Sequence, residues 1–255
     1  MKATFLNHTK PLLCCMVQEE TPDKMIEIIL QANYEGADAF GFQLECWKPE
    51  YMNEETFRYV FKHCLGKPIY VTSYRNHSNS GKTDDECAEI LFMAIRAGAT
   101  LADIMADFYD PQPYEMTYNE TAVEKQKAII ERLHVAGAEV LMSSHTHTHL
   151  DEDTLVAYAK AQRERGADVI KIVNFDYKDE DIDDNFRAIL RIKREVGGHF
   201  LFLATGPKCY PIRQIGTSLG VCMWLCVQSY KPGGSREQPL LRAMKQVKEN
   251  LFYLD

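Results

Sequence analysis

The sequence has no hydrophobic run long enough to cross a membrane. A membrane-spanning helix needs about 20 consecutive apolar residues, and no stretch of the 255 residues approaches that length. The N-terminal residues also lack a basic segment followed by an apolar stretch and a small-residue cleavage site, so we predict no signal peptide. We therefore expect a cytoplasmic protein that does not bind membranes.

Positive charge is scarce as well. The chain carries 29 Lys and Arg against 37 Asp and Glu, a net charge of −8, whereas proteins that bind nucleic acid through its phosphates carry an excess of basic residues. The glycine-rich nucleotide motifs GxGxxG, after the first predicted strand, and GxxxxGK[ST] are both missing. We expect no nucleic-acid partner and no nucleotide cofactor of the common kinds.

Paired cysteine motifs are the third absence. None of the eight cysteines forms a CxxC motif, and all of them lie in apolar or helical surroundings. This pattern is typical of reduced thiols in a protein core, and its spacing does not support a structural zinc site.

The sequence does contain a repeated unit, in which short apolar runs rich in strand-forming residues alternate with amphipathic helical stretches. Eight runs are predicted strands: residues 11–17, 37–44, 68–74, 100–107, 139–145, 168–175, 199–205 and 221–227. Helix after helix ends in Gly-Ala just before a strand, as in "EGADAF", "AGAEVL" and "RGADVI". Eight such units favour an α/β fold, a single (β/α)8 TIM barrel formed by residues 1–255 as one domain.

In such a barrel the chemistry lies where the strands end and on the loops that follow. The polar residues at these places are Gln43, Glu45, Arg75, Asp103, Asp107, His145, Lys171 and Arg213.

Lys171 is the most informative of these residues, because it lies in the apolar strand "ADVIKIVNF". Both faces of a parallel barrel strand are covered, so the amine is costly to bury unless it is paired. Desolvation favours the neutral amine, which is the form that attacks a carbonyl to make a Schiff base. A lysine that extends to solvent, or a structural ion pair, is the competing interpretation. His145, at the end of the preceding strand, would place a proton acceptor at the same mouth and favours catalysis.

At this point the sequence resembles the type I 3-dehydroquinate dehydratases, which are (β/α)8 Schiff-base lyases. "VLMSSHTH" is similar to the family's fifth strand and implies that His145 is the general acid/base, and "ADVIKIVNF" implies that Lys171 forms the imine. "IRQIGTSLG" reproduces an Arg-x-x-Gly-x-x-x-Gly pattern, which implies that Arg213 binds the substrate carboxylate. By the same resemblance, Arg75 in "VTSYRN" has a substrate role, and Asp103 stands where the family has an acidic residue.

Two departures concern recognition of the substrate's hydroxyl groups. The family's second strand ends in Glu-x-Arg, a pair that contacts ring hydroxyls and orients the histidine, where this chain has Gln43 and Glu45. The family's last loop reads Ser-x-Pro-Gly-Gln, where this chain has "SYKPGGSREQ", so Ser229 and Ser235 are the expected contacts there. We expect the family's chemistry with an altered, carboxylated keto-polyol as a candidate substrate.

The resemblance implies dehydration of 3-dehydroquinate to the enone with no metal and no organic cofactor, and a homodimer as the common assembly. Three alternatives remain open: a Schiff-base lyase or aldolase acting on a different keto acid, a non-catalytic barrel that kept Lys171, and a divalent-metal epimerase or hydrolase. The last would use His145, His147 and Asp103, because three histidines recur at every second residue in "SHTHTH". His147 and His149 fall beyond the predicted strand, where alternation no longer aligns side chains.

Overall fold

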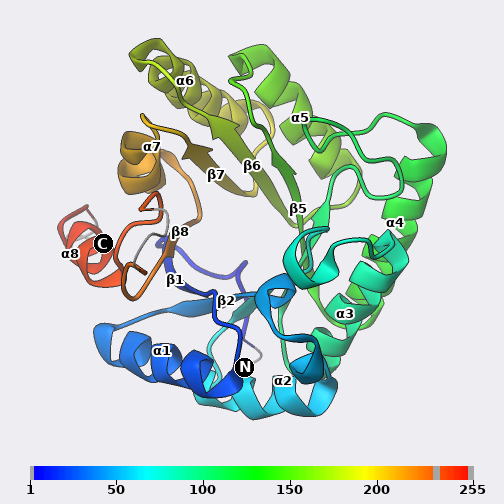
Figure 1. The fold of residues 1–255 in the computed structure, drawn as a ribbon. Helices are drawn as coiled ribbons and strands as arrows, with labels where there is room; N and C mark the ends of the chain where they lie inside the picture. The colour runs from blue at the N-terminus through cyan, green and yellow to red at the C-terminus, as the bar shows by residue number, and fades with distance from the viewer. Residues whose placement is uncertain (1–2, 232–235, 252–255) are drawn as a thin grey trace.

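The computed structural model describes residues 3–231 and 236–251, within which eight parallel strands alternate with eight α-helices (Figure 1). The strands are β1 (Leu12–Val17), β2 (Ala39–Gln43), β3 (Ile69–Thr72), β4 (Leu101–Met105), β5 (Glu139–His145), β6 (Val169–Phe175), β7 (His199–Thr205) and β8 (Met223–Cys226). The helices are α1 (Pro22–Glu35), α2 (Glu54–Phe61), α3 (Asp84–Arg96), α4 (Glu120–Val135), α5 (Glu152–Glu164), α6 (Asp179–Glu195), α7 (Tyr210–Ile215) and α8 (Leu241–Leu251). The predicted (β/α)8 barrel is confirmed.

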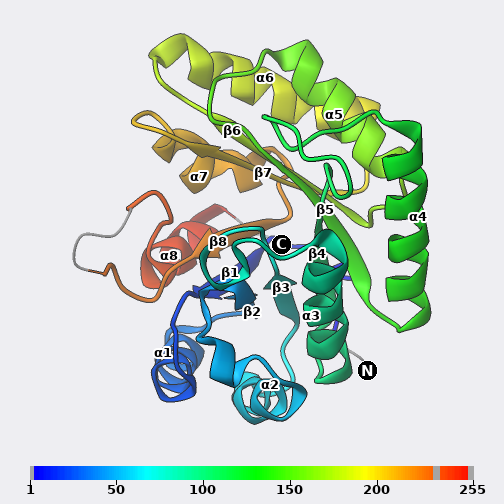
Figure 2. The same ribbon diagram turned by 45° about the vertical axis from the view of Figure 1, so that its right-hand side comes forward.

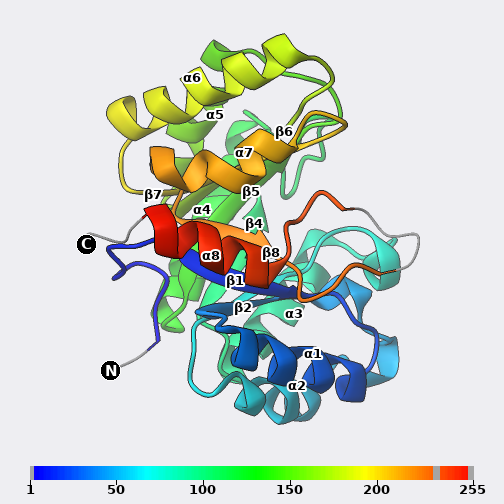
Figure 3. The ribbon, with the colours of Figure 1, turned by 90° about the vertical axis from the view of Figure 1, so that its left-hand side faces the viewer.

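The strands are hydrogen-bonded in the order β7-β6-β5-β4-β3-β2-β1-β8, and the helices lie outside them (Figure 2). No ladder joins β7 to β8 in the part of the chain that the structure describes, but Cys222 N donates to Phe200 O at 2.9 Å. On the other side of this seam, β8 pairs with β1, and α8 packs across both strands (Figure 3). The result is a nearly closed barrel.

Local sequence signals set the helix boundaries. Helix α1 begins with Pro22 in its first turn and ends at Gly36, whose φ of 92° is the left-handed conformation that glycine adopts without strain. Helix α5 begins at Asp151, whose carboxylate accepts a hydrogen bond from Thr154 N at 2.9 Å. Such a cap satisfies one of the free N–H groups of the first turn. The strands are almost entirely buried, since helices cover one face and interior side chains fill the other.

Within residues 3–231 and 236–251, no helix has both the length and the apolar character that a membrane span needs. All eight cysteines carry free thiols. Burial raises the pKa of Cys15 and of Cys222 to about 12, so neither thiol forms a reactive thiolate at neutral pH.

Candidate active site

Lys171 projects into the barrel from β6, and three polar acceptors surround its amine. Its side chain is 5% exposed. Nζ lies 2.5 Å from Tyr74 Oη, 3.0 Å from Tyr70 Oη and 3.2 Å from Asp103 Oδ2. These acceptors match the three N–H donors of an ammonium group. We call Tyr70, Tyr74 and Asp103 the lysine cage.

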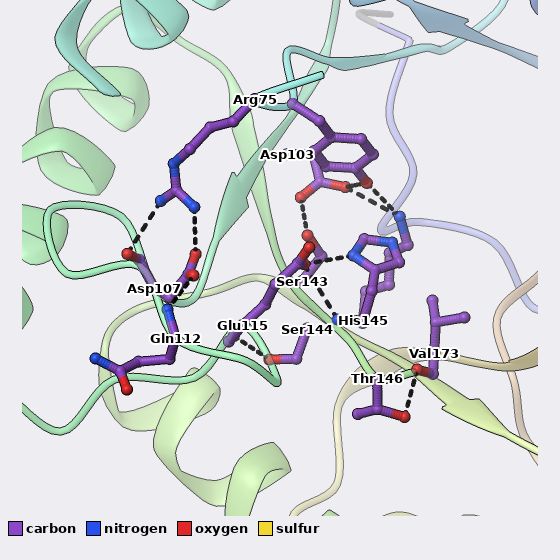
Figure 4. Close-up of polar contacts among 12 residues, drawn as sticks. Arg75, Asp103, Asp107, Gln112, Glu115, Ser143, Ser144, His145, Thr146 and Val173 are labelled. Atoms are coloured by element: carbon purple, nitrogen blue, oxygen red, sulfur yellow. Dashed lines mark hydrogen bonds and ion pairs between the residues drawn. The ribbon is translucent and has the colours of Figure 1, made fainter. Parts of the chain in front are cut away.

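Asp103 is the centre of the lysine cage. Its Oδ2 accepts hydrogen bonds from the hydroxyls of Tyr70 and of Tyr74, the latter at 2.6 Å. Its Oδ1 accepts one from Ser143 Oγ at 2.5 Å (Figure 4). Its side chain has no exposed surface. Burial and the Asp103 charge raise the pKa of both tyrosines well above the usual value, so they remain neutral hydroxyls. A buried lysine is thus matched by one carboxylate and by hydrogen bonds that satisfy it.

His145 lies one layer above Lys171, toward the carboxyl ends of the strands. Lys171 is in register with Ser143 of β5, and His145 follows two residues later, opposite Val173. Two residues along a strand correspond to about 7 Å. The imidazole ring meets the edge of the Tyr74 ring, with centroids 5.1 Å apart and an angle of 77° between the planes. The amine and the imidazole therefore face the same end of the barrel, as the sequence predicted.

Glu115, from the loop between β4 and α4, holds His145 in place. Its Oε2 lies 2.6 Å from His145 Nδ1 and also accepts a hydrogen bond from His145 N at 3.1 Å (Figure 4). Burial alone would raise the pKa of Glu115, but the His145 imidazole and, less strongly, Lys171 hold it below the usual value. The carboxylate fixes the tautomer with a proton on Nδ1 and leaves Nε2 to face a substrate.

The backbone at Glu115 is strained, with a φ of 47°. Only glycine and a few polar residues adopt this left-handed conformation readily, at a cost of about 1 kcal/mol for other residues. Neighbouring groups hold the residue there: Ser144 Oγ donates to Glu115 O at 2.8 Å, and Glu115 N donates to Gln112 O at 3.1 Å. Strain of this kind gathers at functional sites, which is consistent with a role for Glu115 beside His145.

A cavity of about 420 Å³ opens beside these groups, and we call it the histidine cavity. Gln43, Tyr74, Glu115, His145 and His147 are among its lining residues. It is large enough for a small carboxylated ring.

The two residues for which the resemblance implied Glu-x-Arg contact each other, since Gln43 Nε2 donates to Glu45 Oε1 at 3.3 Å, but they differ in burial. Gln43 lines the histidine cavity and accepts a hydrogen bond from Gln18. Glu45 is fully buried, and its carboxylate accepts hydrogen bonds from Thr72 Oγ1 at 2.9 and 3.0 Å and from Tyr74 N at 3.4 Å. Burial raises the pKa of Glu45 to about 7. Glu45 therefore braces the segment that carries Tyr74, and its predicted contact with substrate stays a prediction.

Arg75 lines the histidine cavity, but its guanidinium is directed away from Asp103 and His145 (Figure 4). Nε lies 2.5 Å from Asp84 Oδ1, and Nη1 lies 3.0 Å from Asp107 Oδ1. The pair with Asp107 ties the loop after β3 to the segment after β4, and the pair with Asp84 ties the same loop to the start of α3. The substrate role predicted for Arg75 is untested, and a structural role is already visible.

Arg213 lies in a second cavity of about 210 Å³, the arginine cavity, whose lining includes Gln18, Arg213, Ser229, Lys231 and Glu237. Its side chain is buried, with Nε donating to Ala204 O at 2.6 Å. Nη2 lies 3.8 Å from Glu237 Oε2. The predicted pair Arg213 and Ser229 thus shares one cavity.

Ser235, the other residue predicted in this last loop, lies outside the described residues.

The three histidines of "SHTHTH" do not converge. His145 Nδ1 faces Glu115, His147 is exposed, and His149 Nδ1 lies 3.0 Å from Phe175 O with Nε2 3.3 Å from Asp184 Oδ2. No group of three or more His, Cys, Asp or Glu side chains within residues 3–231 and 236–251 is arranged to hold a metal ion.

Three residues of the site were not predicted from the sequence. Tyr70 and Tyr74 could have been found from the strand pattern. They lie two residues before and two residues after Thr72 in the predicted strand 68–74, and side chains two residues apart on a strand point to the same face. No sequence pattern could have identified Glu115, because it lies in "YDPQPYEMTYN", a loop without a helical or strand period.

Comparisons with known proteins indicate the family and the fold. The family model for type I 3-dehydroquinase matches residues 13–248. A search of curated protein sequences found no match.

Among solved structures, 3-dehydroquinate dehydratase from Geobacillus kaustophilus HTA426 is 17% identical, with 98% of this chain and 94% of that chain covered and a TM-score of 0.79. Type I 3-dehydroquinate dehydratase from Clostridium difficile, described with covalently modified comenic acid, is 14% identical, with 97% and 95% covered and a TM-score of 0.81. At these identities the structures establish a shared fold. The family model, which spans nearly the whole chain, places the protein in the type I 3-dehydroquinase family, a family of hydro-lyases.

Proposed function

We propose that the protein dehydrates 3-dehydroquinate, or a closely related carboxylated keto-polyol, through a Schiff base on Lys171. The observation that carries this proposal is the buried amine of Lys171 in the lysine cage, with the Glu115-oriented imidazole of His145 one layer above it. A structural ion pair alone would not need an oriented imidazole beside it. Family membership supports the same reaction.

Lys171, His145 and Glu115 have separate roles in this reaction. Lys171 attacks the ring ketone, and the resulting iminium acidifies the adjacent carbon. His145 Nε2 removes a proton from that carbon and returns one to the β-hydroxyl as it leaves as water. Glu115 stabilises the imidazolium that exists between these two steps, because its carboxylate lies 2.6 Å from Nδ1.

Carboxylate binding is assigned to the arginine cavity. Arg213 offers a planar, bidentate donor for a carboxylate, and Ser229 lies in the same cavity. Glu237 faces Arg213 at 3.8 Å, so a substrate carboxylate must share the guanidinium with it or displace it. This competition predicts weaker substrate binding than an unoccupied arginine would give.

Hydroxyl recognition is where this chain departs from its family, since Gln43 is the group that faces the histidine cavity. An amide both donates and accepts hydrogen bonds, so the pattern of ring hydroxyls it favours differs from that of a carboxylate. This supports a lyase or aldolase acting on a different keto acid as the second candidate function.

The proposed reaction uses no metal or organic cofactor, because the lysine supplies the electron sink. The homodimer implied by the family is part of the proposal, and sedimentation equilibrium of the purified protein tests it.

Turnover tests the function directly. We expect wild-type protein to convert 3-dehydroquinate to the conjugated enone, detected by ultraviolet absorbance, and Lys171→Met and His145→Asn to lose this activity. Lys160→Met is the matched control, because Lys160 pairs with Glu195 on the outer surface. Turnover of another keto acid in a test panel in preference to dehydroquinate would favour the second candidate function.

A further inference from the structure

Tyr74 occupies a position that the proposed roles of Lys171 and His145 leave unused. Its hydroxyl lies 2.5 Å from Lys171 Nζ and donates to Asp103 Oδ2 at 2.6 Å. These two hydrogen bonds form a continuous path from the amine to the carboxylate. The direct separation of Nζ and Oδ2 is longer, at 3.2 Å.

We propose that Tyr74 is a further catalytic residue, which relays protons between the Lys171 nitrogen and Asp103 while the Schiff base forms and is hydrolysed. This inference rests on the proposed Schiff-base function. It deepens that function by dividing the proton transfers between two groups. Tyr74 and Asp103 transfer protons at the nitrogen, and His145 transfers them at carbon and at the β-hydroxyl.

Imine formation requires that protons leave the nitrogen, and this path offers them a route. An ammonium and a ketone give an iminium and water, so two protons leave Nζ and both end on the ketone oxygen. In the first step Nζ passes a proton to Tyr74 Oη as Tyr74 passes its own to Asp103, which frees the nitrogen lone pair to attack the carbonyl carbon. The carbonyl electron pair moves to oxygen, which takes up the proton held by Asp103, returned through Tyr74, and a second proton released by the nitrogen. The oxygen then departs as water as the C=N bond forms. Hydrolysis reverses these transfers, and the tyrosine is neutral before and after each one.

The raised pKa of Tyr74 is compatible with this relay. Burial and Asp103 make the phenolate unfavourable, so a stepwise path through a tyrosinate is disfavoured. A concerted transfer, in which the hydroxyl gains one proton as it loses another, never forms the phenolate.

Location distinguishes Tyr74 from Tyr70, which contacts the same two groups. Tyr74 lines the histidine cavity and touches the His145 ring, whereas Tyr70 has no exposed surface and lies within β3. Tyr70 Oη is also farther from Nζ, at 3.0 Å. Tyr74 is therefore the hydroxyl between the amine and the space for substrate, and Tyr70 is its support.

The experiment measures imine formation separately from dehydration. Wild type, Tyr74→Phe, Tyr70→Phe and Tyr109→Phe are mixed rapidly with 3-dehydroquinate, quenched with borohydride at set times, and analysed by intact and peptide mass. Tyr109→Phe is the matched control, because it too loses a tyrosine–aspartate hydrogen bond, from Tyr109 Oη to Asp85 at 2.8 Å, outside the site. Rates in mixtures of H2O and D2O count the protons that move together.

We expect Tyr74→Phe to form the imine about 10- to 100-fold more slowly, below or at the lower edge of the usual range for acid–base catalysis, because Asp103 remains within direct reach. Tyr109→Phe should match wild type, and Tyr70→Phe should lose less than Tyr74→Phe. The rate should depend on the deuterium fraction quadratically in wild type, where two protons move together, and linearly in Tyr74→Phe.

Each contrary result has a distinct meaning. A wild-type rate in Tyr74→Phe, an equal loss in Tyr70→Phe, or the same isotope dependence in both proteins would refute the relay while the adduct on Lys171 keeps the Schiff base intact. Absence of any adduct in wild type would refute the Schiff base and the relay together. If Tyr74→Phe does not fold, fluorotyrosine at position 74 keeps the shape and acidifies the hydroxyl. An unchanged rate of imine formation would then refute the relay.

Discussion

Replacing Glu115 with glutamine removes the charge beside His145 and leaves the shape of the loop almost unchanged. In the wild type, one carboxylate oxygen lies 2.6 Å from Nδ1 and also accepts the His145 backbone N–H at 3.1 Å. Glutamine keeps a carbonyl that can accept either hydrogen bond, so the tautomer is retained. The loss is concentrated in the imidazolium that forms when His145 removes the proton from carbon.

The size of the effect follows from the strength of that contact. A hydrogen bond to a charged partner contributes about 1.5–3 kcal/mol, and a neutral one about 1 kcal/mol. Both side chains are about a quarter exposed, 24% and 26%, so solvent screens part of the charge. The difference of about 0.5–2 kcal/mol corresponds to a factor of about 2 to 30. We therefore expect kcat to fall about 2- to 30-fold, with KM within about threefold, in an absorbance assay of enone formation.

Glu131→Gln is the control, because Glu131 is exposed on α4. Its kcat should equal that of wild type. A Glu115→Gln variant with wild-type kcat would show that the contact with His145 does not contribute to catalysis, and a rise in KM without a change in kcat would assign Glu115 to substrate binding instead.

The remaining predictions concern buried charges. Burial raises the pKa of Glu45 from near 4.5 to about 7, so the folded state retains a proton in this range that the unfolded chain releases, and stability falls as pH rises. Between pH 4.5 and pH 8, wild type should lose about 3 kcal/mol more unfolding free energy than Glu45→Gln, measured in urea, and parallel profiles would contradict this. Asp103→Asn leaves the Lys171 amine buried without its carboxylate and should destabilise the fold by about 3 kcal/mol; a loss below about 1 kcal/mol would be inconsistent with an ammonium in the cage. Arg75→Ala should lower the melting temperature and leave KM within about threefold, whereas a large rise in KM would establish the substrate role.

The fold could be predicted in detail because it depends on local, repeated signals. Strands β5 and β7 have the bounds that the sequence predicted, and each of the other strands is shorter by one or three residues. The predicted third strand continued to Tyr74, but β3 ends at Thr72. Beyond that point the backbone N–H of Tyr74 donates to the Glu45 carboxylate instead of to a neighbouring strand. That contact is tertiary, so no local pattern shows it.

Only those site residues that lie on strands could be predicted. Lys171, Asp103 and His145 lie on consecutive strands, where register and alternation determine which side chains face inward. Glu115 reaches His145 from a loop, and the conformation of that loop depends on Ser144 and Gln112 rather than on a sequence period. The resemblance implied a carboxylate at position 43 that orients the histidine, where this chain has Gln43. In the structure the carboxylate beside His145 is that of Glu115, from another loop.

The central claim is that Lys171 forms a covalent imine with substrate. Borohydride reduction of the wild-type protein in the presence of 3-dehydroquinate, followed by peptide mass mapping, tests it most directly. The account predicts a single adduct, on the peptide that contains Lys171, and none in Lys171→Met. An adduct on a different lysine, or no adduct while dehydroquinate is consumed, would contradict it.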